Sequence, residues 1–160
     1  GLKITIISYI GALIGYANKI LLFTNFLSLE QVGLANILIN ASIMYAQFSA
    51  LGVNNITLRF FPFFKDNTKQ HHGFLPIGML IAFVGFLFVS LLFILLKSSI
   101  IGYFSANSPL LVEYYYYLIP LGFFTLFYNY FDSYLRSLHK TVVPVFVYEL
   151  LLRLLVTASI

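Results

Sequence analysis

The chain has 160 residues, of which 61% are hydrophobic, 9% are charged and none is cysteine, and its formal net charge is +4. A soluble domain usually has about 25% charged residues, so this composition excludes an ordinary water-soluble fold, which could not bury so much apolar surface. The lack of cysteine also excludes disulfides, thiolate nucleophiles and cysteine metal ligands. The positive charge does not indicate a nucleic-acid partner, because the cations lie in short connections and not in one patch.

Five apolar segments follow one another along the chain, and each is predicted to form a transmembrane helix, since about 20 helical residues cross the hydrocarbon core. Their ranges are 4–27, 33–57, 74–96, 114–134 and 141–160. Together they predict an all-α membrane protein, a polytopic helix bundle that forms one transmembrane domain over residues 1–160. A cleaved signal peptide is the alternative for the first segment, but its apolar run is about twice the usual length.

The chain starts at Gly1 and stops within the fifth apolar segment, so we expect it to be a piece of a longer, transporter-sized protein. With five crossings, the connections alternate between the two sides of the membrane. One side has only Lys97, and the other side has Lys3, Arg59, Lys65, Lys69, Arg136 and Lys140. The positive-inside rule therefore places the N-terminus and the connections 59–73 and 136–140 in the cytoplasm.

Four side-chain amides fall on one face of the second segment if that segment is a continuous helix. At about 100° per residue they lie within about 40° of one another. The four are Asn36, Asn40, Gln47 and Asn54. Amides in hydrocarbon need hydrogen-bond partners, so the stripe faces either a neighbouring helix or a water-filled cavity. Its length favours a cavity lining, and hydrogen bonding between packed helices remains the alternative.

Lys19 is a cation inside the first segment, roughly 12 Å from the predicted outer end of that helix. On insertion scales a charge at such a depth costs about 2.5–3.5 kcal/mol, and it usually marks a transport pathway or an ion pair. Lys19 shares a helix face with Ser8 and Gly15, which is the face expected to pack inward. Lys19 is therefore predicted to line the cavity.

Glu149 and Arg153 are four residues apart in the fifth segment, so they share a helix face and can pair with each other. One interpretation is an internal salt bridge that allows the helix to insert, and the other is a role in the cavity lining. Asp132 and Arg136 form a similar pair at the end of the fourth segment, where a helix terminus explains them.

No enzyme motif is present: the sequence has no phosphate-binding glycine loop, no zinc-binding helix motif and no serine-hydrolase elbow. His71 and His72 are adjacent and lack the spacing of a helical ligand pair, so a solvated loop is favoured over a metal site. We therefore expect no enzyme activity, no cofactor and no metal. Transport is the class of function that remains.

Two stretches carry a family pattern. In LSLEQVGLANILINASIMYAQFSALGVNNITLRFFPFF, residues 27–64, a short loop with Glu30 and Gly33 leads into a long helix that ends at Leu51-Gly52, followed by an aromatic, basic loop. VYELLLRLL, residues 147–155, contains an acidic and a basic residue within one helix. These patterns resemble bacterial polysaccharide-export flippases of the multidrug/oligosaccharidyl-lipid/polysaccharide exporter superfamily.

The resemblance implies a protein of the bacterial inner membrane with about twice seven helices in two lobes around one cavity, of which this chain is part of the N-terminal lobe. It also implies that the partners are membrane lipids and a lipid-linked oligosaccharide. In such a protein Lys19, and Arg153 if Glu149 does not neutralise it, would bind the diphosphate of the undecaprenyl carrier. The amides of the second segment would bind hydroxyl groups of the glycan.

Two other classes of protein stay open. A multidrug or cation antiporter of the same superfamily would be expected to hold unpaired carboxylates, whereas Glu149 has Arg153 beside it. The two cations and one anion within the segments favour an anionic substrate. A non-transporting membrane scaffold would tolerate the salt bridge, but it gives no reason for Lys19 or for the amide stripe.

Overall fold

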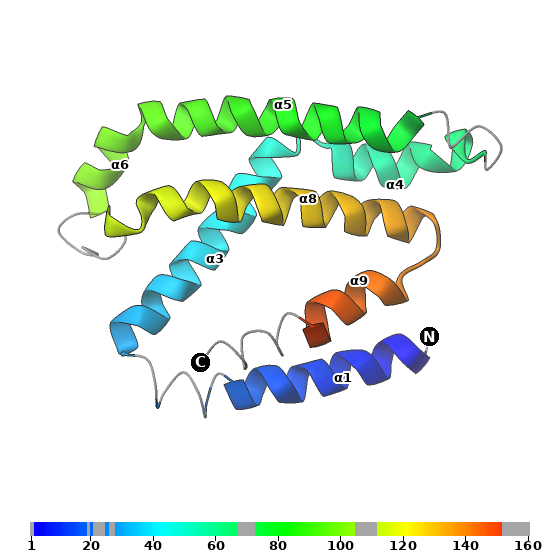
Figure 1. The fold of residues 1–160 in the computed structure, drawn as a ribbon, viewed down its shortest axis with the longest axis horizontal. Coiled ribbons are helices and arrows are strands. Elements are labelled where there is room, and N and C mark those ends of the chain that lie inside the picture. Colours follow the sequence, from blue (N-terminus) through cyan, green and yellow to red (C-terminus); the bar gives the residue numbers. More distant parts are fainter. Residues whose placement is uncertain are drawn as a thin grey trace. The chain divides into compact units, whose positions relative to one another are not determined.

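The computed structural model of the protein describes residues 2–18, 20, 25, 28–66, 73–104 and 112–151. They belong to two compact units, a terminal unit of residues 1–33 and 138–160 and a central unit of residues 34–137. Every element of secondary structure in the described ranges is helical (Figure 1). In chain order these are α1 (Leu2–Ala17), α3 (Leu29–Ser49), α4 (Val53–Phe64), α5 (Phe74–Leu95), α6 (Lys97–Phe104), the 3₁₀ turn η3 (Tyr115–Tyr117), α8 (Leu118–Ser137), α9 (Val142–Phe146) and the π-helical turn η4 (Val147–Leu151).

The prediction of helical structure is confirmed for the described residues, and α5 matches the predicted segment 74–96 closely. The predicted helix 33–57 is wrong as one element, because α3 ends at Ser49 and α4 begins only at Val53. Arg59 was expected in a loop, but it lies inside α4. Lys97 was also expected in a loop, but it begins α6.

Local sequence explains where the helices begin. α3 starts earlier than predicted because Ser28 and Gln31 cap it reciprocally. The backbone N–H of Gln31 donates to Ser28 Oγ at 3.2 Å, and the backbone N–H of Ser28 donates to Gln31 Oε1 at 2.9 Å. Three other helices have proline as their third residue, where the missing N–H has no acceptor within the helix. These prolines are Pro76 in α5, Pro120 in α8 and Pro144 in α9.

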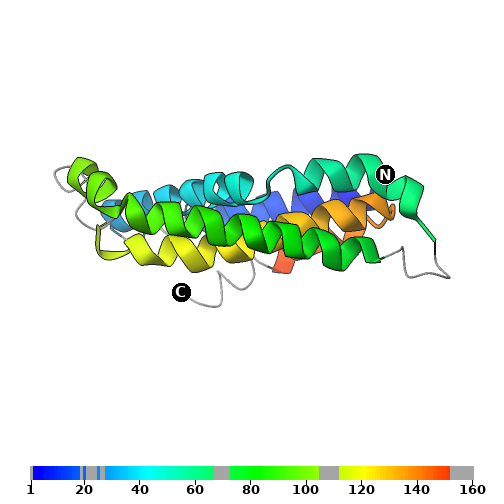
Figure 2. The ribbon, with the colours of Figure 1, turned by 90° about the horizontal axis from the view of Figure 1, so that it is seen from above.

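In the central unit, α5 and α8 lie side by side and antiparallel (Figures 1 and 2). Tyrosine hydroxyls join α5 to α8 near one end, and to the η3 turn that precedes α8 near the other. Tyr130 Oη donates to the carbonyl of Leu75 at 2.9 Å, and Tyr115 Oη donates to the carbonyl of Phe93 at 2.7 Å. The ring of Tyr115 also stacks on that of Phe93, with centroids 4.4 Å apart. These contacts fix the register of the two helices.

α4 and the C-terminal half of α3 pack along this helix pair. At one end, the ring of Phe61 lies 5.5 Å from that of Phe74 and 5.0 Å from that of Tyr134, centroid to centroid. Toward the other end, the hydroxyls of Tyr45 and Ser90 are hydrogen-bonded at 2.5 Å. The chain from α3 into α4 therefore runs antiparallel to α5.

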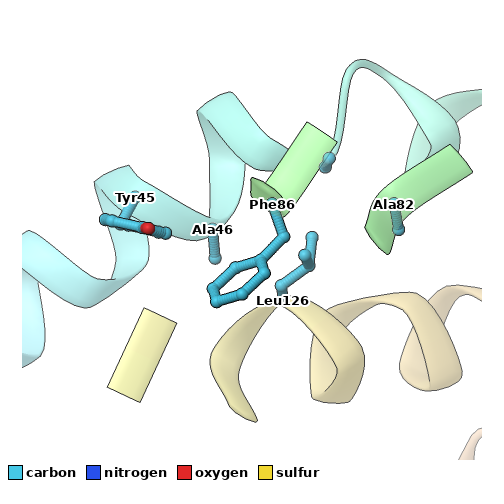
Figure 3. Close-up of a cluster of buried hydrophobic side chains, with 6 residues drawn as sticks. Tyr45, Ala46, Ala82, Phe86 and Leu126 are labelled. Atoms are coloured by element: carbon cyan, nitrogen blue, oxygen red, sulfur yellow. The ribbon is translucent and has the colours of Figure 1, made fainter. Parts of the chain in front are cut away.

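A small apolar core joins α3, α5 and α8 in the central unit (Figure 3). Tyr45 from α3 packs against Phe86 from α5, with ring centroids 5.9 Å apart. Leu126 of α8 is completely buried between these helices. The buried members of the core are Tyr45, Ala46, Ala50, Ala82, Phe86 and Leu126.

α5 turns mostly small residues inward, together with Phe86, and most of its large apolar residues outward. Gly78, Ala82 and Gly85 are buried, whereas the side chains of Leu80 and Leu95 are 64% and 69% exposed. This is the reverse of a soluble helix, and it suits a helix whose outer face contacts lipid. By length and composition α3 and α5 could each cross a membrane, and the apolar part of α1 is shorter.

In the terminal unit, α1 packs against α9 and η4. The contact is closest at Gly11, where an added β-carbon would lie 2.7 Å from the backbone oxygen of Glu149. Asn18, directly after α1, is only 6% exposed. The small residue at position 11 thus allows the backbones of two helices to approach.

Candidate functional site

The turn between α3 and α4 is a defined break in a helix. Leu51 has φ 48° and Gly52 has φ 80°, so both residues are in the left-handed region, which costs a non-glycine residue about 1–2 kcal/mol. The backbone remains hydrogen-bonded on both sides of the turn. The N–H of Ala50 donates to the carbonyl of Ala46, and the N–H of Val53 donates to the carbonyl of Ala50, both at 2.9 Å.

The break packs against α5 at a point where α5 has no side chain. A β-carbon on Gly85 would collide with the carbonyl oxygen of Ser49, and it would lie 2.9 Å from Cγ of Leu51. Any larger residue at position 85 would push the turn away from α5. Glycine is therefore required here by close packing of the backbones.

The break between α3 and α4 also packs against the middle of α5. Gly85 is 11 residues after the first residue of α5 and 10 before the last, which places it roughly 15 Å from each end of the helix. The contacts of Tyr45 with Ser90 and of Phe61 with Phe74 lie on opposite sides of this point. If α5 crosses a bilayer, the break is close to the bilayer centre.

Two side-chain oxygens beside the break are buried and have no hydrogen-bond partner in the described part of the chain. They are Ser49 Oγ, at the end of α3, and Asn54 Oδ1, in the first turn of α4. Buried polar atoms nearly always have partners, and one without a partner costs about 1–3 kcal/mol. Packing alone would favour apolar residues at both positions, and Thr57 Oγ1, one turn further along α4, is buried in the same way without a partner among the described residues.

The predicted stripe of four amides does not form, because the break separates Asn54 from the other three. Asn36, Asn40 and Gln47 are exposed on α3. At about 100° per residue they point roughly 150° away from the buried face of that helix. The residues of the buried face are Ser42, Tyr45, Ala46 and Ser49. Within the central unit, therefore, the three amides do not serve helix packing.

Of the three charged candidates, only Glu149 belongs to the described residues; Lys19 and Arg153 lie outside them, and their roles stay predictions. Glu149 is part of η4, and its Oε2 would be 2.9 Å from a β-carbon on Gly11. Single π-helical turns occur frequently at functional sites. The carboxylate is thus held at a close contact between helices of the terminal unit.

Charged groups mark both ends of the central unit. At the end where Phe61 contacts Phe74, the predicted pair forms: Arg136 Nε donates to Asp132 Oδ1 at 2.9 Å. At the other end, Lys97 Nζ donates to Tyr116 Oη at 2.7 Å and lies 4.4 Å from the centroid of that ring. Among the described residues, no group of three or more His, Cys, Asp or Glu side chains could hold a metal ion.

Sequence reasoning missed Ser49 and the contact at Gly85. The Leu51-Gly52 pattern indicates the end of a helix, but the apolar run continues beyond it, and the predicted helix 33–57 therefore includes Asn54. A serine in an apolar segment gives no signal of its own. In comparisons with known proteins, no protein family, no curated protein and no solved structure matches the chain.

Proposed function

We propose that the protein is a transporter that moves an oligosaccharide linked to undecaprenyl diphosphate across the bacterial inner membrane, for the synthesis of surface polysaccharide. The described helices would belong to a polytopic bundle, in the N-terminal lobe of a protein with a central cavity. The observation that supports this best is the break between α3 and α4, opposite the middle of α5, with the buried oxygens Ser49 Oγ and Asn54 Oδ1 beside it.

In hydrocarbon, irregular backbone is tolerated only where protein buries it or where it lines a water-filled cavity. Helices that break near the middle of the bilayer are a recurrent feature of transporters, because they bring polar atoms and free backbone groups to the substrate. A passive membrane scaffold has no use for such a turn, which costs backbone strain and leaves polar atoms without partners.

The polar residues indicate the chemical nature of the substrate. Side-chain amides both donate and accept hydrogen bonds, as sugar hydroxyls require. Asn36, Asn40 and Gln47 offer three of them on the exposed face of α3. In the sequence, Lys19 and Arg153 supply the positive charge that a diphosphate needs in a medium of low dielectric constant.

A multidrug or cation antiporter is the second candidate, and Glu149 favours it. This carboxylate lies in the π-helical turn η4 against Gly11, and an ionisable residue within a membrane segment is by default a candidate for ion binding. The two functions differ in the charge of the transported compound. They are therefore separable by experiment.

The test is deletion of the gene from its host and re-expression of the full-length protein. The deletion strain should lose surface polysaccharide and accumulate lipid-linked oligosaccharide in the extracted lipids, and re-expression should reverse both changes. Unchanged polysaccharide together with increased sensitivity to cationic drugs would instead establish the antiporter. Neither phenotype would reject both transport functions.

A further inference from the structure

The exposed face of α4 has a shallow depression, which lies outside the residues assigned to the proposed transport site. It is lined by Asn55, Leu58 and Arg59, all of which are exposed. At about 100° per residue, Asn55 and Arg59 point away from the face with which α4 packs. The packed residues of α4 are Val53, Thr57 and Phe61.

Arg59 differs from the other helical cations of the central unit. Arg136 is paired with Asp132, and Lys97 contacts Tyr116. In the part of the chain that the structure describes, Arg59 makes no such bond, and its guanidinium keeps five donors available. The amide of Asn55, one helical turn before it, adds further donors on the same side of α4.

The position of Arg59 along the bundle corresponds to the membrane interface. Phe61 is two residues further along α4, and its ring contacts Phe74, the first residue of α5. Arg59 is therefore only about 3 Å along the helix axis from the level at which α5 begins. Around it, Phe60 is 51% and Phe63 is 83% exposed. Exposed aromatic rings beside cations are typical of a helix segment at the lipid headgroups.

We infer that Asn55, Leu58 and Arg59 form a site for an anionic glycerophospholipid, whose headgroup phosphate is bound by Arg59 and Asn55. The guanidinium can grip two phosphate oxygens at once, which gives charge-assisted and geometrically specific hydrogen bonds. The Asn55 amide donates to the phosphate or to the glycerol ester, and Leu58 contacts the first carbons of the acyl chains. This inference rests on the membrane location of the helices and not on the identity of the transported compound.

The test uses the full-length protein, purified in detergent and examined by native mass spectrometry with phosphatidylglycerol or phosphatidylcholine of the same acyl chains. We expect the parent to retain phosphatidylglycerol selectively, and Arg59→Gln to bind it about tenfold more weakly, which corresponds to about 1.4 kcal/mol. Arg59→Lys should retain part of the binding. The matched control is Arg136→Gln, which removes a paired cation at the same end of the central unit and should bind as the parent does.

Several results would overturn the inference. Equal retention of the two lipids would do so, as would parental binding of phosphatidylglycerol by Arg59→Gln. Binding of undecaprenyl phosphate alone, dependent on Arg59, would assign the depression to the transported lipid and also reject the phospholipid. If Arg59→Gln does not fold, Asn55→Leu provides the second measurement and should weaken binding in the same direction. A transport defect with normal lipid binding would concern the proposed function only.

Discussion

The carbonyl oxygen of Ser49, the last residue of α3, lies directly against Gly85 at the middle of α5, with no room for a β-carbon between them. This contact holds the left-handed turn at Leu51 and Gly52 in place on a helix that is otherwise regular. Gly85 therefore fixes where the break packs, and the break is the main structural observation behind the proposal of transport.

The first prediction concerns this contact. Gly85→Ala should destabilise the full-length protein by about 1–3 kcal/mol, because the added methyl group overpacks the backbone of the break. The matched control is Gly33→Ala in α3, where a β-carbon has no heavy atom within 4 Å. Thermal unfolding in detergent should show a lower Tm for Gly85→Ala only. Equal Tm values for both variants would show that the turn does not depend on position 85.

The second prediction separates stability from function at Asn54. Asn54→Leu should raise stability by about 1 kcal/mol, because it removes a buried oxygen that has no partner in the described residues. Glycan export by the same variant should fall if that oxygen serves the substrate. The stability control is Asn55→Leu, which changes an exposed amide one position away. A lower Tm for Asn54→Leu than for Asn55→Leu would mean that Oδ1 has a partner in the complete protein.

The third prediction tests which surface the amides of α3 face. Cysteines at Asn40 and Gln47 should react quickly in membranes with a polar thiol reagent, because we expect both positions to line a wet cavity. A cysteine at Leu87 should react slowly, although Leu87 is also exposed, since the outer face of α5 is expected to contact lipid. Equally slow labelling at all three positions would return the amides to a role in helix packing outside the central unit.

The fourth prediction is the sidedness of the central unit. Lys65 follows α4 near the first turn of α5, and Ser98 lies in α6 beyond the other end of α5. Cysteines at these two positions should be labelled from opposite sides of the membrane, with position 65 accessible from the cytoplasm. Labelling of both from the same side would contradict a crossing by α5.

Much of the helical structure could be predicted because charge is scarce in this sequence. α5 was predicted almost to the residue, since the uncharged run from Phe74 to Leu96 can hardly be anything but one helix. The pair of Asp132 and Arg136 was predicted because a spacing of four residues on a helix determines a contact. Both successes depend on local sequence alone.

The break and its surroundings could not be predicted in the same way. A helical wheel assumes a constant 100° per residue, and the two left-handed residues at Leu51 and Gly52 end that regularity before Asn54 is reached. The contact that holds the turn depends on Gly85, which is more than 30 residues further along the chain. Tertiary contacts of this kind have no signal in a single sequence, and the same is true of Glu149 against Gly11.

The fifth prediction concerns Lys19, which lies outside the described residues. Lys19→Leu should insert and fold at least as well as the parent, because burying the charge costs about 2.5–3.5 kcal/mol on insertion scales. Glycan export should nevertheless be lost, and Lys19→Arg should keep part of it because the charge persists in an altered geometry. Loss of Lys19→Leu from the membrane, followed by its recovery when Glu149 is also neutralised, would show that the lysine has a structural ion pair instead.

The most direct test is transport by the purified full-length protein in liposomes that contain a labelled oligosaccharide on undecaprenyl diphosphate. The substrate starts in the inner leaflet, and a glycosidase added outside reports how much of it has crossed. The parent is predicted to expose the substrate to the enzyme well above protein-free liposomes, and Lys19→Leu to remain at the protein-free level. Exposure by the parent no greater than in protein-free liposomes would contradict the proposed function, and full exposure by Lys19→Leu would contradict the role of the lysine in it.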